Sequence, residues 1–261
     1  EDRGKLKPEH RSRNAIRKYA REYALLLSNI HIIRTWTKWE REIVSKYPTI
    51  AVDKSIADDL ISRYSCKVFV VPNYPIQDEI LDIPKPKFHN KLSCIYAGVD
   101  KTGNYAKHRD MSQLKILFSN SDIGHLTIIG SGASERSGKV ITLGLLSTRK
   151  QMYEEMSKHS IGLIPWTKHW FHKFANLNKT YEYAHAGLIV LCISSLRSAK
   201  RDLGEYCVTF EEMHDLANNL TSISNDMDAL YKKRLQIFDY ARKNFLWENH
   251  EKNILEAYKI C

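Results

Sequence analysis

The sequence predicts an α/β protein built on an open, doubly wound parallel sheet of the Rossmann-like kind. From about residue 92 onward, strand-like apolar segments alternate with helical patterns. Several of these strands are apolar throughout, as expected for parallel strands that helices cover on both faces. A strand, a helix and a second strand also follow one another within residues 49–71, which predicts a further βαβ unit.

The amino-terminal part contributes helices and this βαβ unit. Apolar residues at three- and four-residue spacing after an early proline are typical of an amphipathic helix. The expected elements are helices over Pro8 to about Ile30 and around Trp36–Ile43, strands at Thr49–Val52 and Lys67–Val71, and a helix around Ser55–Tyr64. Prolines interrupt the stretch that follows, up to Asn90, so we expect a linker there.

The remaining elements belong to the large sheet and its covering helices. The expected strands are Leu92–Ala97, His125–Ile129, Val140–Leu143, Ser160–Ile164, Leu188–Ile193 and Tyr206–Phe210. The expected helices are Arg109–Ser119, Thr148–Lys158, Lys179–Ala186, Ser198–Leu203, Asp226–Asn244 and Trp247–Tyr258. At roughly 100–200 residues per domain, 261 residues make one large domain or two smaller ones.

The charge of the chain favours an anionic partner. Forty Lys and Arg residues against thirty Asp and Glu residues leave a formal net charge of +10. Residues 1–50 hold twelve of the basic and six of the acidic residues, so a net +6 lies there. Such a surplus suits a nucleotide diphosphate, an anionic membrane surface or nucleic acid. Since no helix-turn-helix, zinc-finger or RNP-type motif accompanies it, nucleic acid is the weakest of the three.

Other features exclude whole classes of protein. No run approaches eighteen apolar residues, which excludes a membrane-spanning helix. The five scattered cysteines contain no Cys-x-x-Cys pair, so a disulfide framework and a sequence-evident zinc site are excluded, and a cytoplasmic location is expected. Asp226 and Asp228 form an Asp-x-Asp pair at the start of a long helix, where carboxylates suit the helix dipole without any metal.

Candidate ligand-binding residues follow the strands of the predicted sheet. In open α/β sheets, ligands bind outside the carboxyl ends of the strands. The first strand is followed by Gly98 and a loop with Lys101 and Arg109, the second by Gly130 in a Gly-x-Gly turn, and the fourth by Trp166. Together these residues predict a pocket for an anion that carries a flat ring.

The segment from Asn178 to Gly187 is the most informative one. Asn178 can cap a short helix, whose free N–H groups attract an anion, and Lys179 adds a positive charge there. Lys179 and Glu182 are three residues apart and therefore share a face of the helix. They could hold a diphosphate and the neighbouring ribose hydroxyls, respectively, or they could form an ordinary surface ion pair.

These motifs resemble those of the family 4 retaining glycosyltransferases (glycosyl transferases group 1), which have the GT-B fold. The pattern Lys-x-x-Glu-Tyr-x-x-x-Gly at residues 179–187, followed by an apolar strand, is similar to the family's nucleotide-sugar-binding motif. The resemblance covers about residues 49–261. Its further parts are Val70–Pro75, Tyr96–Gly98, Leu126–Gly132, Val140–Gly144, and Trp247-Glu248 with Tyr258.

The resemblance implies a division of the chain. Residues 1–75 would be the later part of an N-terminal, acceptor-side domain, and residues 76–90 a linker. Residues 91–245 would form the donor-binding Rossmann-like domain, with a closing helix at 246–261 that packs back towards the N-terminal domain. The chain opens on Glu1 without an initiator Met, so we expect a piece of a longer protein.

The resemblance also implies an activity and residue roles. A sugar would pass from a nucleotide-diphosphate sugar to a glycan or lipid-linked acceptor, with retained configuration and without a metal or other cofactor. Arg109 and Lys179 would stabilise the leaving diphosphate. The residues expected to bind the nucleotide sugar are Gly98, Lys101, Gly130, Lys179, Thr180 and Glu182.

The sequence departs from the family pattern at two positions. Val99 follows Gly98 where the family has arginine, and Phe174 stands at the first position of the family's Glu-x7-Glu motif. Two alternatives therefore stay open, a nucleotide-sugar epimerase on the same fold and a non-catalytic nucleotide-binding module. The basic amino-terminal part could also rest on the cytoplasmic face of an anionic membrane.

Overall fold

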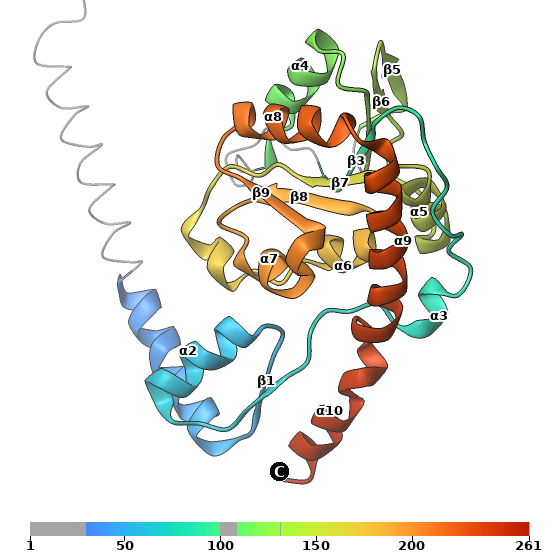
Figure 1. Ribbon diagram of the computed structural model, residues 1–261. Coiled ribbons are helices and arrows are strands. Elements are labelled where there is room, and N and C mark those ends of the chain that lie inside the picture. The colour runs from blue at the N-terminus through green and yellow to red at the C-terminus, as the bar shows by residue number, and fades with distance from the viewer. Residues whose placement is uncertain (1–29, 100–108, 131, 261) are drawn as a thin grey trace, which may run out of the picture.

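The computed structural model describes residues 30–99, 109–130 and 132–260. In these residues the large sheet has seven strands in the order β5-β6-β4-β3-β7-β8-β9, all parallel except the edge strand β5 (Figure 1). The strands are β3 (Ser93–Ala97), β4 (His125–Ile129), β5 (Glu135–Ser137), β6 (Val140–Thr142), β7 (Ile161–Ile164), β8 (Ile189–Ile193) and β9 (Cys207–Phe210). The doubly wound parallel sheet predicted from the sequence is confirmed.

The strand order has a switch point between β3 and β7. From β3 the chain first builds outward through β4 and β6, and then returns to the other side of β3 and continues through β7, β8 and β9. Every residue of β3, β7 and β8 is buried, which is why these strands carry no polar side chain apart from Ser93 at the start of β3. All four described cysteines are free thiols.

Helices cover both faces of this sheet. In Figure 1, α4 and α8 lie above the sheet and α6 and α7 below it. The helices of this part are α4 (Ser112–Asn120), α5 (Arg149–Ser157), α6 (Asn178–His185), α7 (Arg197–Leu203), α8 (Met213–Ser224), α9 (Met227–Asn244) and α10 (Glu251–Tyr258), with 3-10 turns η2 (Trp170–Phe174), η3 (Gly204–Tyr206) and η4 (Trp247–His250). None of the described helices is long and apolar enough to cross a membrane.

Several elements differ from the sequence-based expectation. The helix α4 begins at Ser112 rather than Arg109. Met111 is its N-cap, and the Asp110 carboxylate accepts a hydrogen bond from the Ser112 amide at 2.9 Å just before the helix. The helix expected from Trp247 starts as the 3-10 turn η4. The strand β5, the turn η2 and the helix α8 were not predicted, nor was α3 (Gln77–Ile80), which lies within the expected linker.

The amino-terminal part forms a small parallel sheet of its own. Residues 30–46 are helical without a break, and β1 (Thr49–Ala51), α2 (Lys54–Tyr64) and β2 (Val68–Val70) follow. The two strands pair in parallel, so the βαβ unit is confirmed. The helix expected over Pro8–Ile30 lies outside the described residues except for its last residue.

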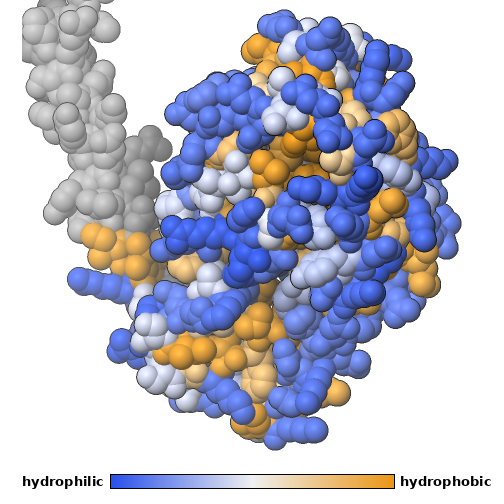
Figure 2. All heavy atoms as spheres, viewed as in Figure 1, coloured by the Kyte–Doolittle hydropathy of each residue, from blue (hydrophilic) through white to orange (hydrophobic). Residues whose placement is uncertain are grey.

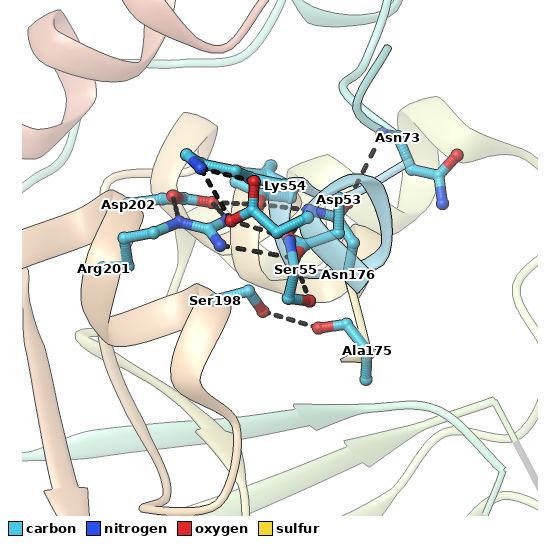
Figure 3. Close-up of polar contacts among 11 residues, drawn as sticks. Asp53, Lys54, Ser55, Asn73, Ala175, Asn176, Ser198, Arg201 and Asp202 are labelled. Atoms are coloured by element: carbon cyan, nitrogen blue, oxygen red, sulfur yellow. Dashed lines mark hydrogen bonds and ion pairs between the residues drawn. The ribbon is translucent and has the colours of Figure 1, made fainter. Parts of the chain in front are cut away.

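The small sheet is joined to the large domain at two places. Helix α10 continues from α9 down to the small sheet and packs against β1 and β2 (Figure 1). Asn253 on α10 donates a hydrogen bond to the carbonyl of Val70 at 2.9 Å. On the other side Asp53, the N-cap of α2, contacts Asn176 of the large domain, with 3.3 Å between Asp53 Oδ2 and Asn176 Nδ2 (Figure 3).

Candidate functional site

A pocket of about 560 Å³ opens at the switch point of the large sheet. It lies outside the carboxyl ends of β3, β4 and β7, where open α/β sheets bind their ligands. Its walls come from the ends of these strands, the segment 145–152 and the start of α6. The lining residues include Ala97, Gly98, Val99, Arg109, Ile129, Gly130, Leu146, Thr148, Arg149, Met152, Trp166, Asn176, Asn178, Lys179 and Glu182.

Glycines form the floor of this pocket. The Gly98 amide donates to the Ile129 carbonyl at 2.7 Å, so the ends of β3 and β4 lie side by side. A Cβ on Gly130 would come within 3.0 Å of the Gly98 backbone, and Gly130 also has φ +109°. A Cβ on Gly98 would lie 2.6 Å from Cε of Lys179. Glycine at both positions therefore lets main chain and the lysine side chain approach each other closely.

Lys179 points from the first turn of α6 across this floor. Its ammonium lies 6.0 Å from the ring centroid of Tyr96 and, among the described residues, makes no ion pair with a carboxylate. Burial lowers the pKa of Lys179, the nearby carboxylate of Glu182 opposes this shift, and Arg109 adds to it. An anion that enters the pocket therefore stabilises the charged form of this lysine.

Glu182 lies one helical turn further on and is buried. Its Oε1 is 3.1 Å from Nη2 of Arg149, while Nε of Arg149 is 2.8 Å from Oε1 of Glu79. Burial raises the pKa of Glu182, against the opposing effects of Arg149 and Lys179. Lys179 and Glu182 therefore do not form the surface ion pair that their spacing also allowed, because Glu182 is buried and pairs with a different cation.

Arg109 reaches the pocket from the end of the loop that follows β3. Its guanidinium stacks over the Trp166 ring at 4.7 Å from the ring centroid, and both residues line the pocket. This is the geometry of a cation–π contact, which orients the guanidinium. Lys179 lines the same pocket, where the positive charge of Arg109 helps to lower its pKa.

The structure brings most of the predicted site residues together. The pocket is lined by Gly98, Arg109, Gly130, Lys179 and Glu182. The predicted position of Lys101 lies outside the described residues.

Two features of α6 differ from the expectation. The side chain of Thr180 is buried and its hydroxyl lies outside the pocket, without a hydrogen-bond partner among the described residues. Asn178 is not the N-cap of α6. Leu177 takes that place without a side-chain hydrogen bond, and Asn178 is the first helical residue, exposed at the rim of the pocket.

Sequence reasoning missed Arg149, which is the direct partner of Glu182. Thr148 caps α5 by accepting a hydrogen bond from the Gln151 amide, and this places Arg149 at the first position of the helix. The signal was present, since a basic residue at the start of a helix that follows a strand lies at the ligand-binding edge of the sheet. Asn176 and Glu79 were also missed.

The charges and shapes of these residues suit a diphosphate joined to a sugar ring. Among the described lining residues, Arg109, Arg149 and Lys179 supply three cations, and Glu182 is the one carboxylate. A carboxylate accepts hydrogen bonds from two neighbouring hydroxyls, and ammonium and guanidinium groups bind phosphate oxygens. No group of three or more His, Cys, Asp or Glu side chains within the described ranges could hold a metal ion.

A second hollow of about 400 Å³ adjoins this pocket. It lies between the carboxyl ends of β1 and β2 and the start of α6, and shares Arg149, Asn178 and Glu182 with the first pocket. Glu182 therefore stands on the wall between the two, in a cleft bounded by both sheets.

The fold is that of the GT-B glycosyltransferases. No protein-family model matches the sequence, and no curated protein matches it. Solved structures do match it, with TM-scores of 0.60 for TarM of S. aureus, 0.56 for HepE of Anabaena in complex with UDP-glucose, and 0.55 for sucrose-phosphate synthase of Thermosynechococcus elongatus.

These likenesses concern the fold and part of each structure. The sequence identities are 12% to TarM, 12% to HepE and 16% to sucrose-phosphate synthase, and the matches cover 85%, 81% and 81% of this chain. They cover 45%, 63% and 57% of the three matched chains, so the protein spans about half the length of these structures.

Proposed function

We propose that this chain is the donor-binding half of a glycosyltransferase that uses a nucleotide-diphosphate sugar. The observation that carries the proposal is the placement of Lys179 and Glu182. One helical turn holds Lys179, which has no carboxylate partner among the described residues, and the buried carboxylate of Glu182 against the same pocket, above a floor of glycines. The donor complexes among the structures of the same fold support it, since HepE is solved with UDP-glucose and TarM with UDP.

In this proposal the diphosphate lies over Gly98 and Gly130, where no side chain separates it from the main chain. Lys179 and Arg109 bind its oxygens, and Glu182 accepts hydrogen bonds from the ribose hydroxyls. The apolar side chains of Leu146 and Met152, on the same wall as Arg149, are placed to contact the base.

We further propose that transfer retains the anomeric configuration and needs no metal. The bond from the sugar to the diphosphate breaks while the acceptor oxygen attacks from the same face, and negative charge develops on the leaving diphosphate. A preorganised donor aimed at such a charge is typically worth about 3–4 kcal/mol. Arg109 and Lys179 fill this role. Arg149 adds positive charge to a pocket in which Val99 stands where the resembled family has arginine.

Titration of the purified protein with UDP and UDP-glucose tests donor binding. We expect Glu182→Ala to lower the affinities for UDP and UDP-glucose at least tenfold while the fold is retained. The matched control Glu154→Ala, on an exposed face of α5, should leave both affinities unchanged. ADP and GDP extend the panel to other bases. Equal affinity of wild type and Glu182→Ala for all of these nucleotides would contradict the proposal.

Turnover distinguishes a transferase from the alternatives. From an α-linked donor we expect release of UDP and an α-linked product, which is the outcome of retention. The reaction should proceed in the presence of a metal chelator. An isomerised sugar nucleotide would identify an epimerase, and binding without donor hydrolysis or transfer in the full-length protein would identify a non-catalytic module.

We also propose that the protein is cytoplasmic and contacts an anionic membrane peripherally, near a lipid-linked acceptor. The helix over residues 30–46 exposes an apolar stripe of Ile32, Trp36, Trp39 and Ile43, which Tyr47 directly after the helix extends. Each of these residues has about half or more of its surface in water. In Figure 2 an apolar patch lies at the start of the helix over residues 30–46. Arg34, Lys38, Arg41 and Lys46 on the same helix complement anionic headgroups.

Co-sedimentation with vesicles tests this contact. We expect binding to phosphatidylglycerol vesicles but not to phosphatidylcholine vesicles, and loss of binding in Trp36→Ser/Trp39→Ser. The control Trp170→Ser removes an exposed indole of the other domain and should leave vesicle binding unchanged. If the stripe instead pairs two copies of the chain, light scattering should show a dimer and the vesicles should bind no protein. The double variant should then be a monomer.

A further inference from the structure

A third hollow, of about 420 Å³, opens at the carboxyl ends of β7, β8 and β9. It therefore lies along the same edge of the sheet as the donor pocket, on the strands beyond the switch point. We call it the basic pocket. Its lining includes Lys168, Trp170 and Lys173 from the segment after β7, Ser194 and Arg197 from the segment after β8, and Glu211 after β9.

The charges of the basic pocket are not balanced. Three cationic side chains face one carboxylate, Glu211, which already accepts a hydrogen bond from Ser194 and lies 3.3 Å from Nζ of Lys168. Among the described residues, Lys173 and Arg197 have no carboxylate within ion-pair distance, and Lys173 instead contacts the Phe174 ring. Two cations that converge on one hollow, with no counter-charge in the part of the chain that the structure describes, attract an anion.

Trp170 gives the basic pocket an aromatic wall. Its side chain is 74% exposed, although large aromatic side chains usually lose most of their surface to the interior. The indole contacts Phe171 edge-on at 6.4 Å and His169 at 5.8 Å between ring centroids, so neighbouring rings orient it. An exposed indole beside hydroxyl and cationic groups suits a sugar ring that carries an acidic substituent.

One segment of the chain connects the basic pocket to the donor pocket. Residues 166–177 contribute Trp166 and Asn176 to the donor pocket, and Lys168, Trp170 and Lys173 to the basic pocket. Nδ1 of the buried His172 lies 2.8 Å from Oγ of Ser195 and fixes this segment to the end of β8. The two pockets thus lie on either side of a single anchored segment.

We propose that the basic pocket binds the phosphate or carboxylate group of an anionic saccharide acceptor. The pocket's affinity for such a saccharide stands on its own residues, whereas the role as acceptor rests on the proposed transferase function. Lys173 and Arg197 bind the acidic group, Trp170 stacks on the sugar ring, and Ser194 or Ser195 contacts a ring hydroxyl.

Ligand-observed NMR titrations with glucose 6-phosphate, glucose and inorganic phosphate test the proposal. We expect the wild type to bind glucose 6-phosphate at least tenfold more tightly than glucose, and several-fold more tightly than inorganic phosphate. Lys173→Ala/Arg197→Ala should abolish this binding. Trp170→Ala should weaken the binding of glucose 6-phosphate but not that of inorganic phosphate. The control Lys232→Ala/Lys233→Ala removes the same number of exposed cations from α9 and should change nothing.

Three outcomes would overturn the proposal. These are equal affinity for glucose and glucose 6-phosphate, equal affinity for phosphate and glucose 6-phosphate, and unchanged binding in Lys173→Ala/Arg197→Ala. Tighter binding of a single-stranded oligonucleotide with a steep salt dependence would also overturn it, in favour of nucleic acid. UDP affinity measured on the same variants separates the two sites. If the wild type binds glucose 6-phosphate but no nucleotide, the proposed transferase function is contradicted, while the proposed ligand of the basic pocket is retained.

Discussion

Asp53 and Arg201 form an ion pair between the two parts of the molecule, although 148 residues separate them in the chain. Nη2 of Arg201 lies 2.7 Å from Oδ2 of Asp53 (Figure 3). Asp53 is fully buried, and burial alone would raise the pKa of its carboxyl. Hydrogen bonds from Arg201 and Ser55 nevertheless hold this pKa below its usual value. The pair therefore ties α2 of the small sheet to α7 of the large domain as a charged pair.

Breaking this pair should destabilise the protein. Asp53→Ala removes the N-cap of α2 and one of the two carboxylates that Arg201 contacts, the other being Asp202. Arg201 keeps part of its surface in water, so we expect a loss of about 1–3 kcal/mol in the free energy of unfolding, below the cost for a fully buried pair. Urea unfolding measures it. The control Asp58→Ala breaks the exposed Lys54–Asp58 pair and should cost less than about 0.5 kcal/mol. Equal losses in the two variants would contradict the buried role of Asp53.

The floor of the donor pocket gives two different glycine effects. Gly130→Ala should lower the free energy of unfolding by about 1–3 kcal/mol, because φ is +109° and the new Cβ meets the Gly98 backbone. In Gly98→Ala the new Cβ meets the flexible end of Lys179. The lysine then moves away, and we expect UDP affinity to fall about tenfold, the effect of about 1.4 kcal/mol.

Urea unfolding and UDP titration on both variants check this contrast. Gly138→Ala is the control, since Gly138 has φ +58° but no atom within 4 Å of the new Cβ. It should lose stability only through its backbone conformation and keep its UDP affinity. A Gly98→Ala variant with wild-type affinity would show that Lys179 does not bind the diphosphate.

Arg149 should set the pH range of donor binding. The carboxylate form of Glu182 accepts the ribose hydroxyls, so affinity for UDP should fall as the pH is lowered through the pKa of Glu182. Burial raises this pKa and Arg149 opposes the rise. Arg149→Met should therefore move the midpoint of the affinity curve to higher pH. Lys150→Met, which breaks an exposed pair with Asp82, is the control and should leave the midpoint in place. Coincident curves for all three proteins would exclude Glu182 as the titrating group.

A buried histidine should make the protein sensitive to acid. Burial lowers the pKa of His185 to about 4, while its Nε2 lies 2.9 Å from the Phe245 carbonyl. An unfolded histidine titrates near 6.5, so between these values the unfolded chain binds more protons and stability falls as the pH falls. We expect His185 to contribute a loss of about 2 kcal/mol between pH 7 and pH 5.

Urea unfolding at the two pH values tests this expectation. His185→Gln should show a smaller difference between them, since glutamine can donate to the Phe245 carbonyl and does not titrate. His214→Gln, at an exposed position on α8, should keep the wild-type difference. An unchanged difference in His185→Gln would mean that other groups carry the acid sensitivity.

The large sheet was predictable because its strands are buried on both faces. Ile189–Ile193 and Ser93–Ala97 are fully buried, so their apolar runs mark their bounds to within a residue or two. The helix α8 was missed for a local reason. Its start depends on reciprocal hydrogen bonds between Glu212 and Asp215. Such a pair does not match the usual pattern of a serine or threonine followed by glutamate, and so it does not signal a helix start.

The candidate site was predictable only where its residues are close in sequence. Lys179 and Glu182 share one turn of helix, so their spacing alone placed them on one face. Arg149 is 33 residues from Glu182, and their contact depends on the order of the strands in the sheet. The Asp53–Arg201 pair depends on how two separate sheets meet, which no periodicity in the sequence encodes.

The descent of α10 onto the small sheet has a consequence for the order of folding. The strands β1 and β2 have three residues each, and two short strands are at best marginally stable in water. Their neighbours α10 and Asn253 come from the last residues of the described chain. A ribosome therefore releases β1 and β2 long before it makes the helix that completes them. Removal of residues 247–260 should accordingly loosen the small sheet, visible as faster amide hydrogen exchange in β1 and β2.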